Sequence, residues 1–139
     1  MIDTPAAVVD LDSLERNLSR WQSYCDDAGL RSRPHVKTHK CVEIARMQVE
    51  LGARGITCQK LGEAEVMVDA GLDDVLIPYN LLGDEKLRRL TALLERAQVS
   101  VTVDDAALLP GLARAARDAG RELRVLVECD TGLGRAGVQ

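Results

Sequence analysis

The feature that most constrains the fold of this chain is a regular alternation of two kinds of segment. Short segments rich in Val, Ile and Leu alternate with longer segments in which apolar residues recur every three or four positions. The short segments are typical of buried strands and the longer ones of amphipathic helices. Strands that alternate with helices indicate an α/β fold with a parallel sheet and right-handed crossovers. Strands are predicted at 33–37, 55–59, 74–78, 99–103 and 123–128, and helices at 12–28, 42–51, 61–70, 84–97 and 109–119.

The predicted strands follow one another about every 23 residues, which is a usual step for a (β/α) barrel. A closed barrel of this kind needs eight strands and about 250 residues. The chain has 139 residues and five such strands, so it is either an open sheet or the front part of a longer barrel. The final segment, 134–139, has no predicted helix after it. We therefore expect an incomplete, TIM-like barrel.

One more extended segment precedes these units. Ala6–Leu11 is a short β-like run, and the helix that follows is predicted to begin at Asp12, which stands three residues before Glu15 as in a capping box. The helix ends before Gly29. Its apolar face is predicted to consist of Leu14, Leu18, Trp21 and Cys25.

The composition excludes several function classes. A formal charge of −4 gives no electrostatic basis for binding nucleic acid or an anionic membrane. Aromatic residues are so few that base-stacking platforms are not expected. For the same reason, the core must be aliphatic. No apolar run approaches the roughly 20 residues that cross a bilayer, and Met1–Pro5 does not resemble a signal peptide, so we expect a soluble, cytoplasmic protein.

The chain contains four cysteines without a Cys-x-x-Cys pair. Without an export signal, we expect them to be reduced and mostly buried. Their wide spacing does not favour a metal site. They are Cys25, Cys41, Cys58 and Cys129.

The segment richest in reactive side chains is Arg33-Pro-His-Val-Lys-Thr-His-Lys40, at the end of the first predicted barrel strand. Ligand sites of α/β folds lie at the carboxyl ends of the strands, which is where Lys37 falls. A partly desolvated lysine can have a lowered pKa, as a Schiff base requires, whereas an isolated strand-end lysine is ordinarily solvated. His35 and His39 have the spacing of a metal pair on a helix, but strand and turn are predicted here, so we do not favour a metal.

Polar residues also follow two other predicted strands. Thr57 and Gln59 share a face near the end of one strand, and Glu128 and Asp130 share a face near the end of the last. These residues are candidates for contacts with a ligand. An ordinary structural role, such as a surface salt bridge for Glu128, is the alternative.

The last segment also fits a dinucleotide-binding pattern, because Gly132, Gly134 and Gly137 follow a strand as G-x-G-x-x-G. That interpretation needs a helix beginning within the glycines and an acidic residue about 20 positions further on. We favour a turn that carries Arg135 instead.

Four stretches of the chain form a joint pattern that covers nearly all of it: Thr4–Asn17, Arg33–Lys40, Thr57–Glu65 and Asp130–Val138. Together, in this order, they closely resemble the D-threonine aldolase and D-serine dehydratase family of fold-type III pyridoxal-phosphate enzymes. The resemblance implies an alanine racemase-like (β/α) barrel with a second, mostly β domain. Residues 1–139 would be the N-terminal part of the cofactor-binding barrel, with about five barrel strands. Residues 4–11 would be a strand belonging with the C-terminal β domain, which this chain lacks.

The resemblance also implies roles for individual residues. Lys37 resembles the lysine that forms the Schiff base with pyridoxal 5′-phosphate, with Lys40 as the rival in the same motif. Arg135 resembles the arginine that lies against the ring oxygen of the cofactor. Glu128 stands where related racemases carry a carbamylated lysine, whose negative charge holds that arginine. Gln59 and His35 are expected to contact the cofactor.

The implied function is a lyase that acts on D-β-hydroxy-amino acids, by retro-aldol cleavage of D-threonine-like substrates to glycine and an aldehyde. A D-serine dehydratase on the same scaffold, an amino-acid racemase and a non-catalytic protein that holds pyridoxal phosphate are the alternatives. A divalent metal (Mn, Mg or Zn) is expected only with the C-terminal domain, and no metal ligand in this chain. For the full-length protein the resemblance implies a homo-oligomer, a dimer. We expect the 139-residue chain alone to bind the cofactor weakly, to be inactive and to associate through its incomplete barrel.

Overall fold

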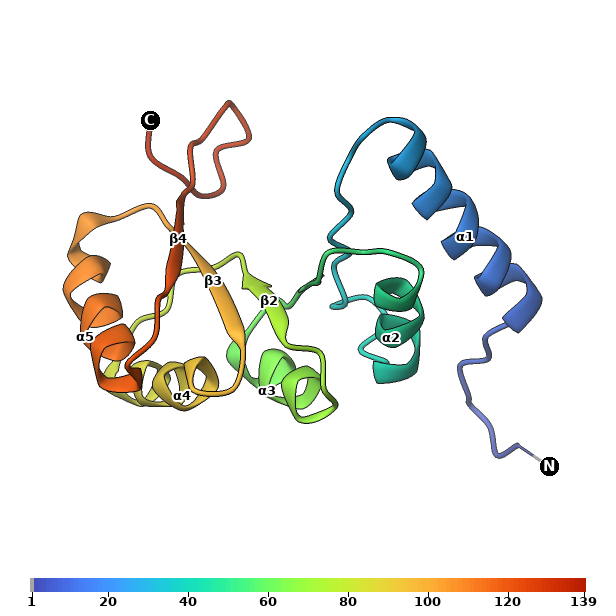
Figure 1. Ribbon diagram of the computed structural model, residues 1–139, viewed down its shortest axis with the longest axis horizontal. Helices are drawn as coiled ribbons and strands as arrows, with labels where there is room; N and C mark the ends of the chain where they lie inside the picture. The colour runs from blue at the N-terminus through green and yellow to red at the C-terminus, as the bar shows by residue number, and fades with distance from the viewer. Residues whose placement is uncertain (1) are drawn as a thin grey trace.

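The computed structural model describes residues 2–139, in which helices and strands alternate as the sequence predicts (Figure 1). The strands are β1 (Ile56–Thr57), β2 (Asp74–Ile77), β3 (Gln98–Val103) and β4 (Arg124–Val127). The α-helices are α1 (Leu11–Asp27), α2 (Val42–Glu50), α3 (Leu61–Asp69), α4 (Asp84–Leu94) and α5 (Leu109–Ala119), with a short 3₁₀ helix η1 (Ala106–Leu108).

The four strands form one parallel sheet in the order β1-β2-β3-β4. Each crossover between neighbouring strands contains a helix, α3, α4 or α5, as a parallel sheet requires. Val75 of β2 stands opposite Ile56 of β1 on one side and Val99 of β3 on the other. The predicted α/β class is confirmed, and the sheet is the wall of an incomplete barrel.

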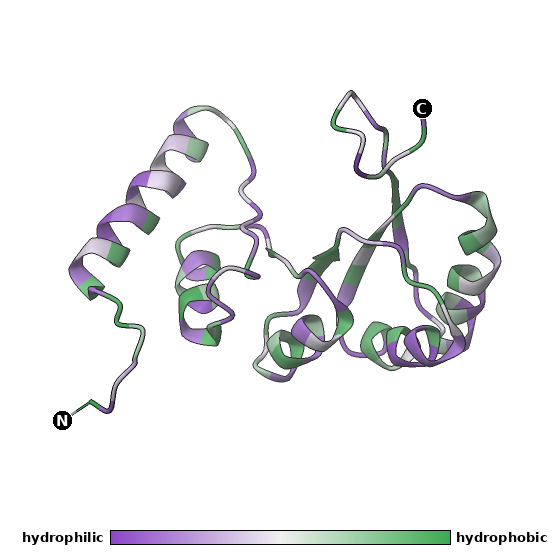
Figure 2. Ribbon diagram, turned by 180° about the vertical axis from the view of Figure 1, so that it is seen from behind, coloured by the Kyte–Doolittle hydropathy of each residue, from purple (hydrophilic) through white to green (hydrophobic). Residues whose placement is uncertain are grey.

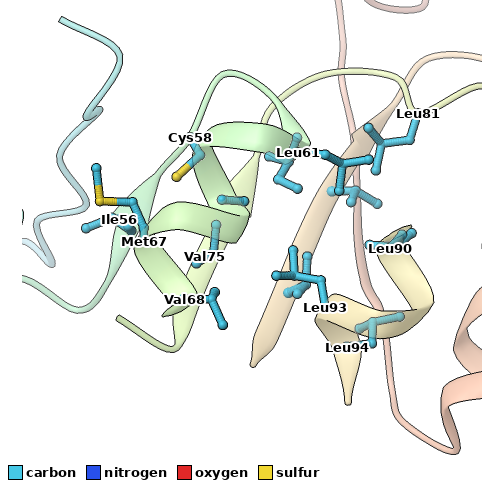
Figure 3. Close-up of a cluster of buried hydrophobic side chains, with 14 of the residues drawn as sticks. Ile56, Cys58, Leu61, Met67, Val68, Val75, Leu81, Leu90, Leu93 and Leu94 are labelled. Atoms are coloured by element: carbon cyan, nitrogen blue, oxygen red, sulfur yellow. The ribbon is translucent and has the colours of Figure 1, made fainter. Parts of the chain in front are cut away.

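The core is aliphatic, as the scarcity of aromatic residues predicts. Figure 3 shows the buried side chains between the sheet and the helices α3 and α4. Complete burial of one Leu, Ile or Val side chain stabilises the fold by about 1.5–3 kcal/mol. Figure 2 shows that the strands are among the most hydrophobic parts of the ribbon, whereas the helices carry both colours. The helices therefore cover the sheet with one face and meet solvent with the other.

The first predicted barrel strand is shorter than expected. Arg33–Lys37 forms only an isolated parallel bridge to β1, between His35 and Thr57. Thr57 N donates to Pro34 O at 2.8 Å, and Val36 N donates to Thr57 O at 2.9 Å. Pro34 has no N–H with which to extend the pairing, and the chain turns directly after it. The segment nevertheless lies beside β1, at that edge of the sheet.

The first helix begins earlier than predicted. Its N-cap is Asp10, not Asp12, because the carboxylate of Asp10 accepts a hydrogen bond from Ser13 N at 2.7 Å. Asp10 has extended backbone geometry, which leaves its side chain free to bond three residues ahead. Leu11 therefore belongs to α1, and residues 4–10 form no strand within the described part of the chain. Their pairing with a C-terminal β domain stays a prediction.

Helix α1 lies apart from the sheet, on the far side of α2 (Figure 1). Of its predicted apolar face only Cys25 is buried, whereas Trp21 is 56% exposed and donates its indole N–H to Ser32 Oγ at 3.1 Å. The Trp21 ring stacks on the similarly exposed ring of Tyr24. Within residues 2–139 no helix is long and apolar enough to cross a membrane.

The four cysteine thiols are free but differ in exposure. Cys25 and Cys58 are buried, Cys41 is half-buried and Cys129 is exposed, so the expectation of mostly buried thiols is only half right. Desolvation raises the pKa of Cys58 to about 12, which makes it an unreactive core thiol.

Candidate active site

A cavity of about 320 Å³ lies at the carboxyl ends of the strands, in the place where α/β folds bind ligands. Loops from four positions of the sheet contribute to it: the His35 segment and the loops after β1, β2 and β4. The five residues to which the resemblance gives a role at the cofactor all line it, namely His35, Lys37, Gln59, Glu128 and Arg135. They come from segments up to 100 positions apart in the chain, and the parallel sheet brings them together.

Lys37 reaches the cavity because it directly follows the bridge to β1. His35 and Lys37 are two residues apart, and both line the cavity. Lys37 Nζ is exposed and lies 3.4 Å from Gln59 Oε1. Gln59 is held in turn, because its backbone N–H donates to the carboxylate of Glu63 at 2.8 Å in the first turn of α3. The start of α3 thus places the amide beside the amine.

Lys40, the rival lysine, does not line this cavity. Its backbone has φ 50°, in the left-handed region. Residues other than glycine adopt this conformation mainly in tight turns. Its N–H donates to Val36 O at 2.8 Å, and its ammonium lies 3.6 Å from the carboxylate of Glu63. The turn that follows Val36 therefore separates the two lysines of the motif.

His35 contributes a neutral imidazole. Its Nδ1 accepts a hydrogen bond from Lys37 N at 3.3 Å, which leaves the ring proton on Nε2. Burial lowers the pKa of His35, and the charge of Lys37 lowers it further. Nε2 is buried and finds no hydrogen-bond partner among the described residues. A buried polar atom without a partner is uncommon in a folded protein and calls for an explanation.

Arg135 is carried by a closed turn that follows β4 and stands above it in Figure 1. Asp130 N donates to Val138 O at 2.8 Å, and Val138 N donates to Glu128 O at 2.9 Å, so the two ends of the turn are joined. Inside it, the carboxylate of Asp130 accepts the backbone N–H groups of Gly132 and Gly134 at 2.9 and 3.0 Å. These backbone hydrogen bonds lower the pKa of Asp130.

The glycines of this segment serve the turn and not a dinucleotide site. Among residues 132–139 no helix begins, although the dinucleotide pattern requires one. Gly137 has φ 107°, and a Cβ on it would stand 2.5 Å from Asp130 N. Only glycine allows the two arms of the turn to approach this closely.

Glu128 and Asp130 both line the cavity, but beyond the end of β4 and in different roles. Asp130 turns inward to cap the glycines. Glu128 is half-buried, and within residues 2–139 it forms no ion pair with Arg135. The holding role of Glu128 stays a prediction. Thr57, the other strand-end candidate, is buried and does not line the cavity.

Sequence reasoning did not assign roles to three further lining residues. Tyr79 follows β2, and Cys129 and Thr131 flank Asp130. The signal for Tyr79 was its place after β2, and Cys129 carries the same signal after β4, where it is exposed. These residues give the cavity a phenol, a thiol and a hydroxyl beside the basic groups.

The chain is similar in sequence to a known family and to curated proteins. The family described as "Alanine racemase, N-terminal domain" matches residues 9–139. D-threonine aldolase from Arthrobacter sp. is 46% identical over 137 residues, which cover 99% of this chain and 36% of that protein. The chain therefore spans about a third of the length of the curated relative it matches.

Solved structures agree with the sequence match. The crystal structure of D-threonine aldolase from Filomicrobium marinum superposes with a TM-score of 0.96 at 46% identity, covering 99% of this chain and 37% of that one. D-threo-3-hydroxyaspartate dehydratase from Delftia sp. HT23 superposes with a TM-score of 0.89 at 39% identity, covering 100% of this chain and 37% of that one. The chain therefore follows the same overall path as these solved relatives.

Proposed function

Since this chain belongs to the alanine racemase N-terminal domain family, we propose that its strand-end cavity binds pyridoxal 5′-phosphate and that Lys37 forms the covalent link to it. We further propose that the chain is the lysine-bearing part of a lyase for D-β-hydroxy-amino acids. The observation that carries the proposal is the meeting of His35, Lys37, Gln59 and Arg135 on one cavity. The names of the relatives, D-threonine aldolase and D-threo-3-hydroxyaspartate dehydratase, support the substrate class.

The residues present fit this cofactor. A volume of about 320 Å³ is within the range of roughly 300–1,000 Å³ typical of small-molecule sites. The cavity offers a primary amine for an aldehyde and a guanidinium for an ionised ring oxygen. The buried, unpartnered Nε2 of His35 gives the ligand a further polar partner. An aldehyde-bearing pyridine with an anionic oxygen needs such a set of groups.

Lys37 is the group that would hold the cofactor covalently, through Nζ. When bound, pyridoxal phosphate supplies an electron sink that stabilises negative charge at Cα of the amino acid. Gln59 Oε1, 3.4 Å from Nζ, orients the amine towards the cavity. The neutral His35 next to Lys37 adds no second positive charge that would disfavour approach of a cationic amino group.

Arg135 would place a fixed cation against the ring oxygen of the cofactor, where it stabilises negative charge. Glu128, on the same cavity wall, supplies a carboxylate that can orient that guanidinium once a ligand occupies the space between them. A Glu128→Gln variant that leaves cofactor affinity unchanged would remove the support for this role.

Aldolase activity is the reaction that the similarities favour, because the D-threonine aldolase match is the stronger in both sequence and structure. In that reaction the β-hydroxyl loses its proton, the Cα–Cβ bond breaks to release an aldehyde, and Cα gains a proton to give glycine. A dehydratase is the second candidate, supported by the 39% identity to D-threo-3-hydroxyaspartate dehydratase. It removes the Cα proton and the β-hydroxyl, giving an oxo acid and ammonia.

The cofactor assignment is tested by reducing the chain with borohydride after incubation with pyridoxal phosphate, followed by peptide mass mapping. We expect a pyridoxyl group on the peptide that contains Lys37. Lys37→Arg abolishes this labelling, whereas Lys40→Arg, a matched change three residues away, leaves it in place. Labelling scattered over many lysines, or retained in Lys37→Arg, would contradict the assignment.

The reaction is tested in a chimera that joins this chain to the remaining part of the Arthrobacter D-threonine aldolase. We expect glycine and acetaldehyde from D-threonine, with no turnover by the 139-residue chain alone. 2-Oxobutanoate and ammonia would favour the dehydratase, and conversion of D-threonine only to its Cα epimer would favour a racemase. Labelling at Lys37 without any turnover by the chimera would favour a non-catalytic protein that holds the cofactor.

A further inference from the structure

Three consecutive strand-end loops are tied together beside the cavity by one carboxylate. Asn80 follows β2, Asp104 follows β3, and Gly137 belongs to the turn after β4. Asn80 Nδ2 donates to Asp104 Oδ1, and Gly137 N donates to Asp104 Oδ2 at 3.1 Å. Both oxygens of Asp104 therefore accept a hydrogen bond, one from the loop before it and one from the loop after it.

The hydrogen bond from Gly137 N differs from the other hydrogen bonds of the turn that carries Arg135, because it leads to another loop. The other hydrogen bonds of residues 130–138 join the turn to itself or to its own base at Glu128. Within the described residues, Asp104 provides the one hydrogen bond that ties this turn to the loop of another strand. Gly137 is two residues from Arg135, so this bond holds backbone close to the residue that carries the guanidinium.

Neither Asn80 nor Asp104 lines the cavity that holds Lys37 and Arg135. The amide of Asn80 and the N–H of Gly137 both lower the pKa of Asp104. The carboxylate is then charged throughout the neutral range, when it is the strongest acceptor for both donors. Asn80 and Asp104, outside the cavity, are thus linked to the turn that carries Arg135 on the cavity wall.

We propose that Asn80 and Asp104 are positioning residues, which hold the Arg135 turn over the cavity through the N–H of Gly137 and so set the affinity for pyridoxal phosphate. The effect on cofactor affinity rests on the proposed function. The hydrogen bonds that link Asn80, Asp104 and Gly137 do not depend on it. A cation that is to stabilise a developing charge must be held in place before the charge appears. Residues behind such groups are the usual means of holding them.

The test uses a charge swap. Asn80→Asp places two carboxylates against each other, whereas the double variant Asn80→Asp/Asp104→Asn restores an amide–carboxylate pair with the roles exchanged. In the double variant the amide oxygen introduced at position 104 can still accept from Gly137 N. Asp105→Asn is the matched control, because Asp105 is exposed and adjacent, and its carboxylate accepts a hydrogen bond from Ala107 N of η1 and not from the Arg135 turn.

The first readout is backbone hydrogen–deuterium exchange of the peptide 128–139 in the chain without cofactor. Loss of a hydrogen bond to a charged group raises exchange by about tenfold. We expect this increase in Asn80→Asp, recovery in the double variant and no change in Asp105→Asn. The β3 peptide is the internal reference, because a general loss of stability would raise its exchange as well. Unchanged exchange of 128–139 in Asn80→Asp, or an increase that the double variant does not reverse, overturns the inference.

The second readout is the dissociation constant for pyridoxal phosphate and the pH midpoint of the absorbance change of the bound cofactor. We expect Asn80→Asp to weaken binding severalfold and to raise the midpoint, because a fixed cation near the cofactor favours its deprotonated form. The double variant restores both. If the wild type acquires no pyridoxyl group at Lys37, the proposed function fails. The exchange experiment still tests whether Asn80 and Asp104 hold the Arg135 turn. If the wild type binds and Asn80→Asp binds equally well, the positioning role is wrong.

Discussion

Nζ of Lys37 lies 3.4 Å from Oε1 of Gln59, although 22 residues separate them in the chain. Gln59 is fixed from the other side by its backbone bond to the carboxylate of Glu63. The amine is thus held by an element, α3, that belongs to the next βα unit. The contact links Lys37 to the βα unit that follows its own segment.

Removal of the Gln59 amide should weaken the capture of the cofactor. We expect Gln59→Leu to raise the pyridoxal phosphate concentration for half-maximal labelling of Lys37 by about threefold, because one exposed hydrogen bond stabilises by less than about 1 kcal/mol. Borohydride titration with peptide mapping measures this. Gln98→Leu, at an exposed position on β3 away from the cavity, is the control and should match the wild type.

The Arg135 turn should depend on pH through Asp130. The folded-state pKa of Asp130 is lowered by the N–H groups of Gly134 and Gly132, so its contribution is fully present above the ordinary carboxyl pKa of about 4 and is lost as pH falls through the lower folded value. We expect the amide NMR shifts of both glycines to stay constant from neutral pH to about pH 5 and to move in more acidic solution. Asp130→Asn should abolish the transition, and Asp118→Asn on α5 should leave it unchanged.

Core and surface leucines should differ sharply in their effect on stability. Leu90 of α4 is fully buried against the sheet, whereas Leu82, in the loop before that helix, is 71% exposed. Leu90→Ala should lower the free energy of unfolding by about 2–5 kcal/mol through lost burial and the cavity it leaves. Leu82→Ala should change it by less than about 0.5 kcal/mol in the same urea titration. Equal effects would contradict the described packing.

The outer edge of β4 should drive association of the isolated chain. β4 pairs with β3 on one side only, and its apolar residues Val125, Leu126 and Val127 are 41, 46 and 65% exposed. An unpaired apolar edge is a template for another strand, and a lysine there opposes such pairing. Val127→Lys should therefore shift the chain towards monomer in sedimentation velocity. Val66→Lys, the same change at an exposed position of α3, should have no effect.

The helices and strands could be predicted because each one has a local period. The spacing of Leu87, Leu90 and Leu94 places α4 to within a few residues, and the β-branched run before Asp104 marks β3. The predicted boundaries were wrong where a local contact, and not the spacing of apolar residues, sets the end of a helix or strand. The start of α1 depends on the side chain of Asp10, and the strand at His35 is cut short by a proline and a turn.

The candidate site could also be predicted in large part, since residues after parallel strands meet at one edge of the sheet. This rule placed Gln59 and Glu128 correctly beside Lys37 on the cavity. It could not separate Thr57 from Gln59, because which of them faces the cavity depends on where β1 stops. It also left Asn80 without a role, because its partner Asp104 lies 24 residues away, on a different loop.

The sequence by itself determined the class of the fold and the set of residues at the strand ends, because both follow from periods and breaks that neighbouring residues encode. Only the tertiary structure separated Lys37 from Lys40 in space, since the turn after Val36 sends one lysine to Gln59 and the other to Glu63. It likewise decided that Asp104 ties the Arg135 turn to Asn80. Such contacts join residues far apart in the chain, and the register of the parallel strands, which no local pattern contains, brings them within bonding distance.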